Sequence, residues 1–304
     1  MQKAFGAAMF FAFSPAVFWP YFGGVAIVLL GLFATRHDIA QAQGLDKVVA
    51  FGRVCFAAPL AVFGAEHLTS TKDIMQLVPA YMPGRLFWTY FVGVALIAAA
   101  LSIALNIRMR WSGTLLGIMF ILFVLMMDIP GVAGNPKDRF GWTLALRELS
   151  FASGAWALAG SQTEDWRSGG TSWMITVARY VIAIAAIFYG LEHLLHPAAL
   201  PGVPLEKLTP AWIPGRLIAG YLTGAALATA GVCLLIGMKM RMAAACLGTW
   251  ILIIVLLMYL PMVIAIPSAA EAGVKIEGLN YFFDTLLFGG TVLALANALP
   301  KARP

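Results

Sequence analysis

Long apolar runs are the feature that most constrains this chain. A helix needs about 20 apolar residues to cross the roughly 30 Å hydrocarbon core of a bilayer, and about nine such runs can be laid along the sequence. Hydrophobic residues make up 61% of the 304 residues and charged residues 11%, against roughly 45–50% and about 25% in soluble domains. The sequence therefore predicts an all-α polytopic membrane protein with little room for a soluble domain.

The distribution of charge and cysteine excludes several function classes. The net charge of +6 comes from Lys and Arg residues that sit singly in short loops, which indicates membrane topology and not a nucleic-acid patch. Cys55, Cys233 and Cys246 lie inside apolar runs without paired spacing. A disulfide framework, a thiol relay and a thiolate metal site are therefore not expected. The expected partner is the lipid bilayer, and no nucleic acid.

A duplication divides most of the chain into two similar copies. Residues 63–68, FGAEHL, recur at 189–194 as YGLEHL. Residues 77–96, LVPAYMPGRLFWTYFVGVAL, recur at 208–227 as LTPAWIPGRLIAGYLTGAAL. Order and spacing are preserved, and weaker matches continue beyond these segments. Each half is therefore predicted to be one copy of the same unit.

Each copy is predicted to form a four-helix transmembrane bundle. The N-terminal segment is 1–44, the first copy 45–165 and the second 166–304. The helices are expected at 46–68, 84–106, 111–130 and 140–160, and then at 173–195, 215–237, 242–266 and 279–298. Four crossings return the chain to its starting side, so the copies are predicted to be parallel repeats related by an axis along the membrane normal.

The N-terminal segment and the loop charges give the expected orientation. The apolar run from Ala4 to Ala34 is too long for a signal-peptide core and lacks an A-x-A-like cleavage site, so we expect a retained helix, tilted or kinked at Pro15 and Pro20. Lys and Arg are more frequent on the C-terminal side of the membrane. The positive-inside rule then predicts a multi-pass inner-membrane protein with a cytoplasmic C-terminus and with the Glu-His and Pro-Gly-Arg motifs on the outer face.

Ionisable residues at membrane depth are the candidate functional residues, since each costs at least ~2.5–3.5 kcal/mol on insertion scales. In both copies a Glu-His pair ends the first helix, an Arg follows Pro-Gly at the start of the second, and a further carboxylate lies about two turns into the fourth. These residues are Glu66, His67, Arg85 and Glu148 in the first copy and Glu192, His193, Arg216 and Asp284 in the second. They are expected at similar depth within each bundle.

Two interpretations of these residues are open. In one, His67 or His193 transfers protons while Arg85 or Arg216 holds an anionic or carbonyl ligand. In the other, which is the more frequent case, the Arg ties helices together and the Glu-His pair caps a helix end. His with carboxylates can also bind a transition metal, but we assign no metal ligand.

Two further features bear on the site. Tyr81 and Trp212 each lie between two prolines before a helix start, where they suit the aromatic belt of the membrane interface or a stacking lid over a flat ligand. Asp128 and Arg147 have no charged counterpart in the second copy, where Tyr259 and Phe283 stand. If one site is active, we expect it in the first copy.

The string Gly-x-Glu-His-Leu, followed by x-x-Pro-x-(Tyr/Trp)-(Met/Ile)-Pro and a second helix rich in aromatics and glycine, resembles the DoxX-like family of small four-helix membrane proteins. The resemblance covers nearly the whole chain after the N-terminal helix, once per copy. It implies a four-helix bundle per copy and an association with redox systems, since named members are a membrane subunit of a thiosulfate:quinone oxidoreductase and partners of oxidative-stress enzymes. The chain departs from this pattern in its duplication and in lacking a cysteine pair, which puts a thiol mechanism in doubt.

Three functions fit these features. The first is a redox-associated subunit that binds a quinone or another lipid-soluble molecule near the outer face and works with a soluble or membrane redox partner. No haem, flavin, iron-sulfur or nucleotide motif is visible, so electrons would come from that partner, and the sequence does not decide whether the chain is an enzyme. The second is a non-enzymatic assembly or accessory subunit. The third is a small-solute or lipid transporter, which parallel repeats and outer-face charges disfavour.

Overall fold

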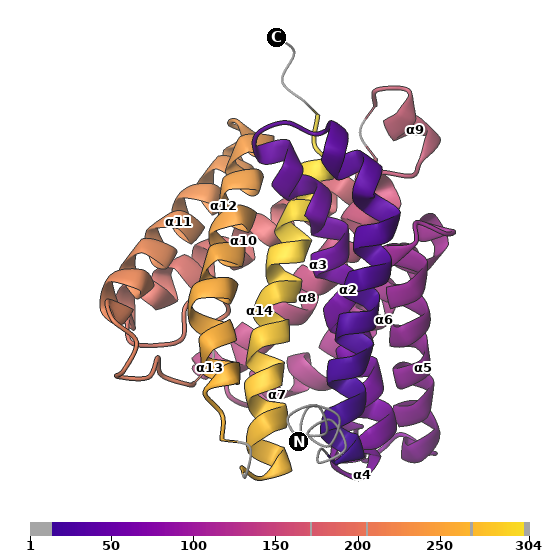
Figure 1. Cartoon of the computed structure of the whole chain (residues 1–304), viewed down its shortest axis with the longest axis vertical. Helices are drawn as coiled ribbons and strands as arrows, with labels where there is room; N and C mark the ends of the chain where they lie inside the picture. The colour runs from indigo at the N-terminus through magenta and orange to yellow at the C-terminus, as the bar shows by residue number, and fades with distance from the viewer. Residues whose placement is uncertain (1–13, 171, 205, 268–269, 301–304) are drawn as a thin grey trace, which may run out of the picture.

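The chain folds as a bundle of long helices (Figure 1). The computed structural model describes residues 14–170, 172–204, 206–267 and 270–300. Within these residues, eight helices are long and apolar enough to cross a membrane. The prediction of an all-α polytopic membrane protein is therefore confirmed.

The helices follow the order expected from the repeat. The N-terminal helix is α2 (Pro15–Gln41). The first copy contains α3 (Leu45–Thr69), α4 (Thr71–Ile74), η1 (Met75–Leu77), α5 (Arg85–Ala104), α6 (Met109–Phe123), η2 (Val124–Asp128), α7 (Ile129–Gly134) and α8 (Arg139–Gly160). After α9 (Glu164–Arg167), the second contains α10 (Trp173–Leu195), α11 (Arg216–Ile236), α12 (Met240–Ile254), η3 (Val255–Tyr259), α13 (Leu260–Ile264) and α14 (Ala272–Ala298). The division expected between residues 165 and 166 falls inside α9.

The bounds differ most from expectation at two places. Helix α14 begins at Ala272, before the expected start at 279. Helix α2 begins at Pro15 and runs to Gln41, whereas the apolar run ends at Ala34. Proline at the first helical position needs no backbone N–H and has a φ suited to a helix start, so Pro15 begins the helix and does not kink it. The part of the expected helix before residue 14 lies outside the described residues.

Both copies contain the same interruption of their third spanning helix. The π-helical segments η2 and η3 occupy 124–128 and 255–259, and Pro130 and Pro261 follow them two residues later. Proline lacks an N–H and its ring clashes with the carbonyl four residues earlier, so it disturbs the regular hydrogen-bond pattern of the helix there. The carbonyl of Met126, which lies four residues before Pro130, accepts a hydrogen bond from the Tyr81 hydroxyl at 3.3 Å. The loop before α5 is thereby fastened to η2.

The centre of the molecule is built from both copies. Helix α3 packs against α14, α8 packs against α10, and α14 also contacts α8. The first helix of each copy thus lies against the last helix of the other (Figure 1). Helices α5 and α6 flank this centre on one side, and α11 and α12 flank it on the other. The eight helices of the two copies therefore share one core and do not form two separate bundles.

Helix α8 spans the bundle although it is less apolar than the eight other long helices. It carries Arg147 and Glu148, and it lies between α6, α10 and α14. All but one of residues 150–160 are buried. A helix that neighbouring helices shield from lipid tolerates the charges that would be costly on a lipid-facing helix.

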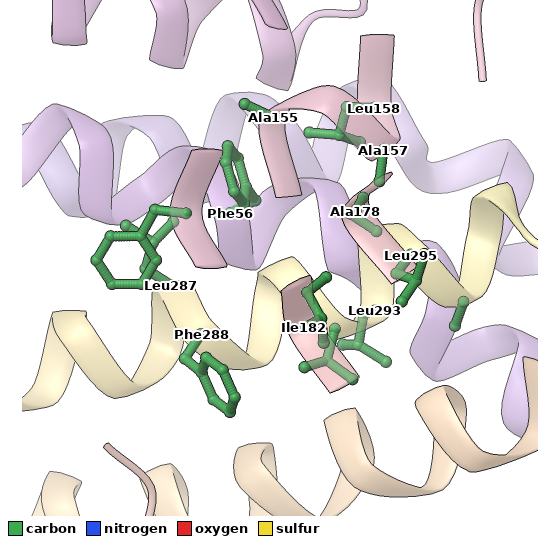
Figure 2. Packing of buried hydrophobic residues seen from close by; sticks show 14 of the residues in the cluster. Phe56, Ala155, Ala157, Leu158, Ala178, Ile182, Leu287, Phe288, Leu293 and Leu295 are labelled. Atoms are coloured by element: carbon green, nitrogen blue, oxygen red, sulfur yellow. The ribbon is translucent and has the colours of Figure 1, made fainter. Parts of the chain in front are cut away.

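Small residues allow the central helices to approach closely. Figure 2 shows Phe56 of α3, Ala155 of α8, Ile182 of α10 and Phe288 of α14 in one apolar cluster. Gly290 of α14 lies so near the backbone of α3 that an added Cβ would be 2.7 Å from the Cys55 carbonyl carbon. In lipid, helix association depends on such close packing, since water drives no apolar burial there.

Replacing Gly290 tests this close approach. Gly290→Ala is expected to destabilise the protein by about 1–3 kcal/mol, because the added methyl pushes α14 away from the α3 backbone. The thermal unfolding midpoint in mild detergent measures the effect. Gly131→Ala in α7, where a Cβ meets nothing within 4 Å, is the control and should not lower the midpoint. Equal midpoints for Gly290→Ala and the wild type would contradict the close packing.

Candidate functional site

A cavity of about 920 Å³ lies among the helices of the first copy and α14. This volume falls in the range of roughly 300–1,000 Å³ that is typical of small-molecule sites. Its walls come from α3, α5, α6, η2 and α8, from α4, η1 and the loop before α5, and from α14 of the second copy. Because α14 packs against both α3 and α8, the crossed arrangement of the copies builds this cavity.

Apolar side chains make up most of the cavity wall. They include Trp88, Phe91 and Val92 from α5, Met119, Phe120 and Phe123 from α6, Met126 and Met127 from η2, and Phe140, Leu144 and Phe151 from α8. Aromatic rings offer flat faces for contact, and methionine side chains adapt to irregular shapes. Such walls suit the apolar body of a ligand.

Polar side chains from three helices form the other part of the wall. Arg147 of α8 makes ion pairs with Asp284 of α14 (Nη1–Oδ2, 2.9 Å) and with Glu148 (Nη2–Oε1, 3.0 Å). With its amide nitrogen turned toward Glu66 of α3, Asn280 donates to both carboxylate oxygens, at 3.0 and 2.7 Å. Asn280 and Asp284 are four residues apart and so share one face of α14. The two groups of contacts therefore adjoin, and all five residues line the cavity.

Among the residues that the structure describes, three buried polar atoms of cavity side chains have no hydrogen-bond partner. They are Asp128 Oδ2, Arg147 Nε and Glu148 Oε2. Buried polar atoms in proteins are nearly always hydrogen-bonded, because a buried polar atom without a partner loses its bonds to water and gains none in return. These atoms belong to side chains that line the cavity, so their bonding capacity is available to a bound molecule.

His67 lies in the cavity wall next to Glu66. Its Nδ1 donates to the Phe63 carbonyl at 2.7 Å, since a carbonyl oxygen can only accept. In the neutral ring, Nε2 is then an acceptor. A histidine held in this way can exchange a proton with a ligand through Nε2.

The residues expected to form one site per copy are distributed differently. Glu66, His67 and Glu148 of the first copy line one cavity, and Asp284 of the second copy joins them. Arg147 supplies the guanidinium in this wall. The sequence singled out Arg147 only as a charged residue without a charged counterpart in the second copy.

The other predicted residues lie outside this cavity wall. Arg85 begins α5 with its Nε buried and unpartnered. Arg216 donates to the Thr209 carbonyl at 3.3 Å. Tyr81 and Trp212 have 69% and 58% of their surface exposed, as residues of an interface belt would. Glu192 pairs with Arg139 at the start of α8, 2.7 Å apart, and so ties the two copies together.

A longer loop fills the corresponding region of the second copy. The offset between the copies is 126 at FGAEHL and 131 at the Pro-rich loop, so the second copy has 131 − 126 = 5 additional residues there. Leu200 and Val203 of this loop are buried, with 0% and 1% exposed. Leu200 packs with Met258 and Tyr259, which occupy the positions that Met127 and Asp128 have in the first copy.

His193 holds this loop in place. Its side chain is fully buried, and the Gly202 N–H donates to its Nε2 at 3.1 Å. The Tyr259 hydroxyl donates to the Pro201 carbonyl at 2.9 Å. His67 and His193 therefore occupy equivalent positions in different surroundings: one lies in a cavity wall and the other is bonded to the loop.

Comparison with known proteins gives one partial similarity. A family model described as a domain of unknown function (DUF8561) matches residues 56–130. The matched segment runs from within α3 to within α7, includes the loop before α5, and supplies the α3, α5, α6 and η2 walls of the cavity. It ends before α8 and α14, which carry Arg147 and Asp284. No curated protein and no solved structure matches the chain.

Removing Arg147 tests the polar wall. Arg147→Ala leaves Asp284 and Glu148 without their partner, and breaking a buried ion pair from one side typically costs about 3–5 kcal/mol. We expect a large fall in the unfolding midpoint, partly recovered when Asp284→Asn is added.

Lys207→Ala is the matched control for this experiment. It breaks the 3.1 Å pair with Glu277, whose side chain is 52% exposed, and exposed pairs contribute about 0–1 kcal/mol. If Arg147→Ala were no more destabilising than Lys207→Ala, the pair would not hold α8 to α14.

Proposed function

We propose that this integral membrane protein binds a lipid-soluble small molecule with a polar head group in the first-copy cavity. The proposal is carried by one observation: a cavity of about 920 Å³ with mostly apolar walls is also lined by residues whose buried polar atoms have no partner. Sites for small molecules typically combine apolar walls with a few placed polar groups. The spanning helices around the cavity make the bilayer the natural source of such a ligand.

A quinone is the ligand that the resemblance to DoxX-like proteins predicts, with the chain as a redox-associated membrane subunit. The aromatic wall supports this form of the proposal, since a flat ring can stack there. Arg147 Nε can donate to a ring carbonyl, and His67 Nε2 can exchange the accompanying proton. Electrons would come from a soluble or membrane partner.

A substitution borrowed from the second copy tests whether the cavity holds a ligand. Trp250 stands where the first copy has Met119, and it donates to Thr223 at 3.0 Å. Met119→Trp therefore fills the cavity with a side chain that this fold already accommodates. Wild-type protein and the variant are purified in mild detergent, and organic extracts are analysed by mass spectrometry, with and without added short-chain ubiquinone. We expect the occupancy of the bound molecule to fall about tenfold or more in the variant, because the ring occupies the ligand's volume.

Leu115→Trp is the matched control, since Leu115 lies on the same helix with 62% of its surface exposed. It should retain wild-type occupancy and a wild-type unfolding midpoint. If wild-type protein carries no small molecule and does not take up ubiquinone, the quinone form of the proposal fails. If the cavity takes up no other lipid-soluble molecule either, a non-enzymatic accessory subunit is the better description.

The proposal also includes an orientation, with the cavity near the outer face of the inner membrane. The loop-charge bias supports it, and the cavity lies toward the start of α8 and α14, at the opposite end of the bundle from the end of α14. In a cysteine-free background, we expect Lys137→Cys to react with a membrane-impermeant maleimide on intact spheroplasts. Arg110→Cys, at the opposite end, should react only after lysis. The reverse pattern would overturn the orientation.

A further inference from the structure

Acidic side chains outnumber basic ones in the cavity wall. Five carboxyl groups line it, and one of them, Glu277, is paired with Lys207 outside the wall. The other four, Glu66, Asp128, Glu148 and Asp284, have Arg147 as the guanidinium among them. These groups form one electrostatic cluster: Asp128 interacts with Arg147 and Glu148, and Glu66 interacts with Asp284. Four carboxyl groups therefore share one permanent positive charge.

Arg147 satisfies only part of this acidic group. Its two terminal nitrogens contact Asp284 and Glu148. Glu66 has the neutral amide of Asn280 as its hydrogen-bond donor, which supplies no charge. Asp128 Oδ2 and Glu148 Oε2 are buried without a partner. An uncompensated carboxylate away from water is strongly unfavourable, so the cluster needs a further positive charge or bound protons.

The geometry of this cluster does not suit a metal ion. Among the residues that the structure describes, no three His, Cys, Asp or Glu side chains are grouped so as to hold one. The space next to the carboxyl groups is also far larger than an ion requires. It is lined by Trp88, Phe120, Phe140 and Phe151, and aromatic faces attract organic cations.

We propose that the ligand of this cavity is an amphipathic organic cation, with its positive head at Asp128 and Glu148 and its apolar body against the aromatic and methionine walls. The inference rests on the proposed function and names the chemical class of the ligand. It differs from the quinone form of that proposal in the charge of the head group. The two therefore predict different ligands for the same cavity.

Two probes of matched shape and opposite charge test the head group. Tetraphenylphosphonium and tetraphenylborate each carry four phenyl rings around one central atom, so they differ chiefly in charge. Binding of each radiolabelled ion to the purified protein in nonionic detergent is measured by equilibrium dialysis against protein-free micelles. We expect saturable, one-site binding of tetraphenylphosphonium, with a Kd at least about tenfold below that of tetraphenylborate, because the carboxyl groups attract one charge and repel the other.

Neutralising single carboxyl groups locates the bound cation. Asp128→Asn should weaken tetraphenylphosphonium binding about tenfold, and Glu148→Gln is a second variant should the first fail to fold. Asp73→Asn removes the same charge from an exposed position on α4 outside the cavity wall, and it should leave the Kd unchanged.

The outcomes separate this inference from the proposed function. Equal or tighter binding of tetraphenylborate, or an unchanged Kd in folded Asp128→Asn and Glu148→Gln, overturns the proposal that the ligand is a cation. Uptake of ubiquinone that Met119→Trp abolishes, without tetraphenylphosphonium binding, also overturns the cation but supports the proposed function. If neither probe nor ubiquinone binds and the cavity takes up no other lipid-soluble molecule, both fail.

Discussion

Arg147 on α8 pairs with Asp284 on α14, and this contact joins a helix of one copy to a helix of the other. The position of α14 against α3 and α8 determines which residues share a wall. It brings Asn280 to Glu66 and closes a space that the first copy alone would leave open. The acidic character of the cavity has the same origin, since Asp284 comes from the second copy. One helix–helix contact therefore sets both the shape and the charge of the candidate site.

The same Glu-His motif has different surroundings in the two copies. His67 and His193 follow the same Glu and end equivalent helices, yet His193 is bonded to a loop that the first copy lacks. That loop places Leu200 among the residues that would otherwise face a cavity. Tyr259 replaces Asp128 and bonds the loop backbone. A short insertion and a few substitutions therefore separate the candidate site of the first copy from the packed region of the second.

Much of the fold follows from the sequence, because bilayer thickness sets helix length and apolar runs report it directly. Gly-Arg at residues 84 and 85 marked the start of α5, and Pro130 lies next to an interruption that its missing N–H explains. The crossed packing could not be predicted in this way. The sequence of an apolar helix face does not show whether that face packs against helices of its own copy or of the other copy. The sequence analysis therefore placed Asp284 in the same bundle as His193. The change of offset between the copies is visible in the sequence as additional residues in the second copy. Nothing in the sequence shows that these residues are buried.

The crossed packing also bears on how such a fold could exist without duplication. A chain with a single copy would lack the helix that closes its own cavity, and it would have to borrow that helix from a second subunit. A two-fold homodimer provides it, since each subunit then completes the other in the same way. Both cavities of that dimer would be identical, and any insertion that filled one would fill the other. Joining the copies in one polypeptide removes this constraint, so that one half can specialise in packing while the other retains an open chamber.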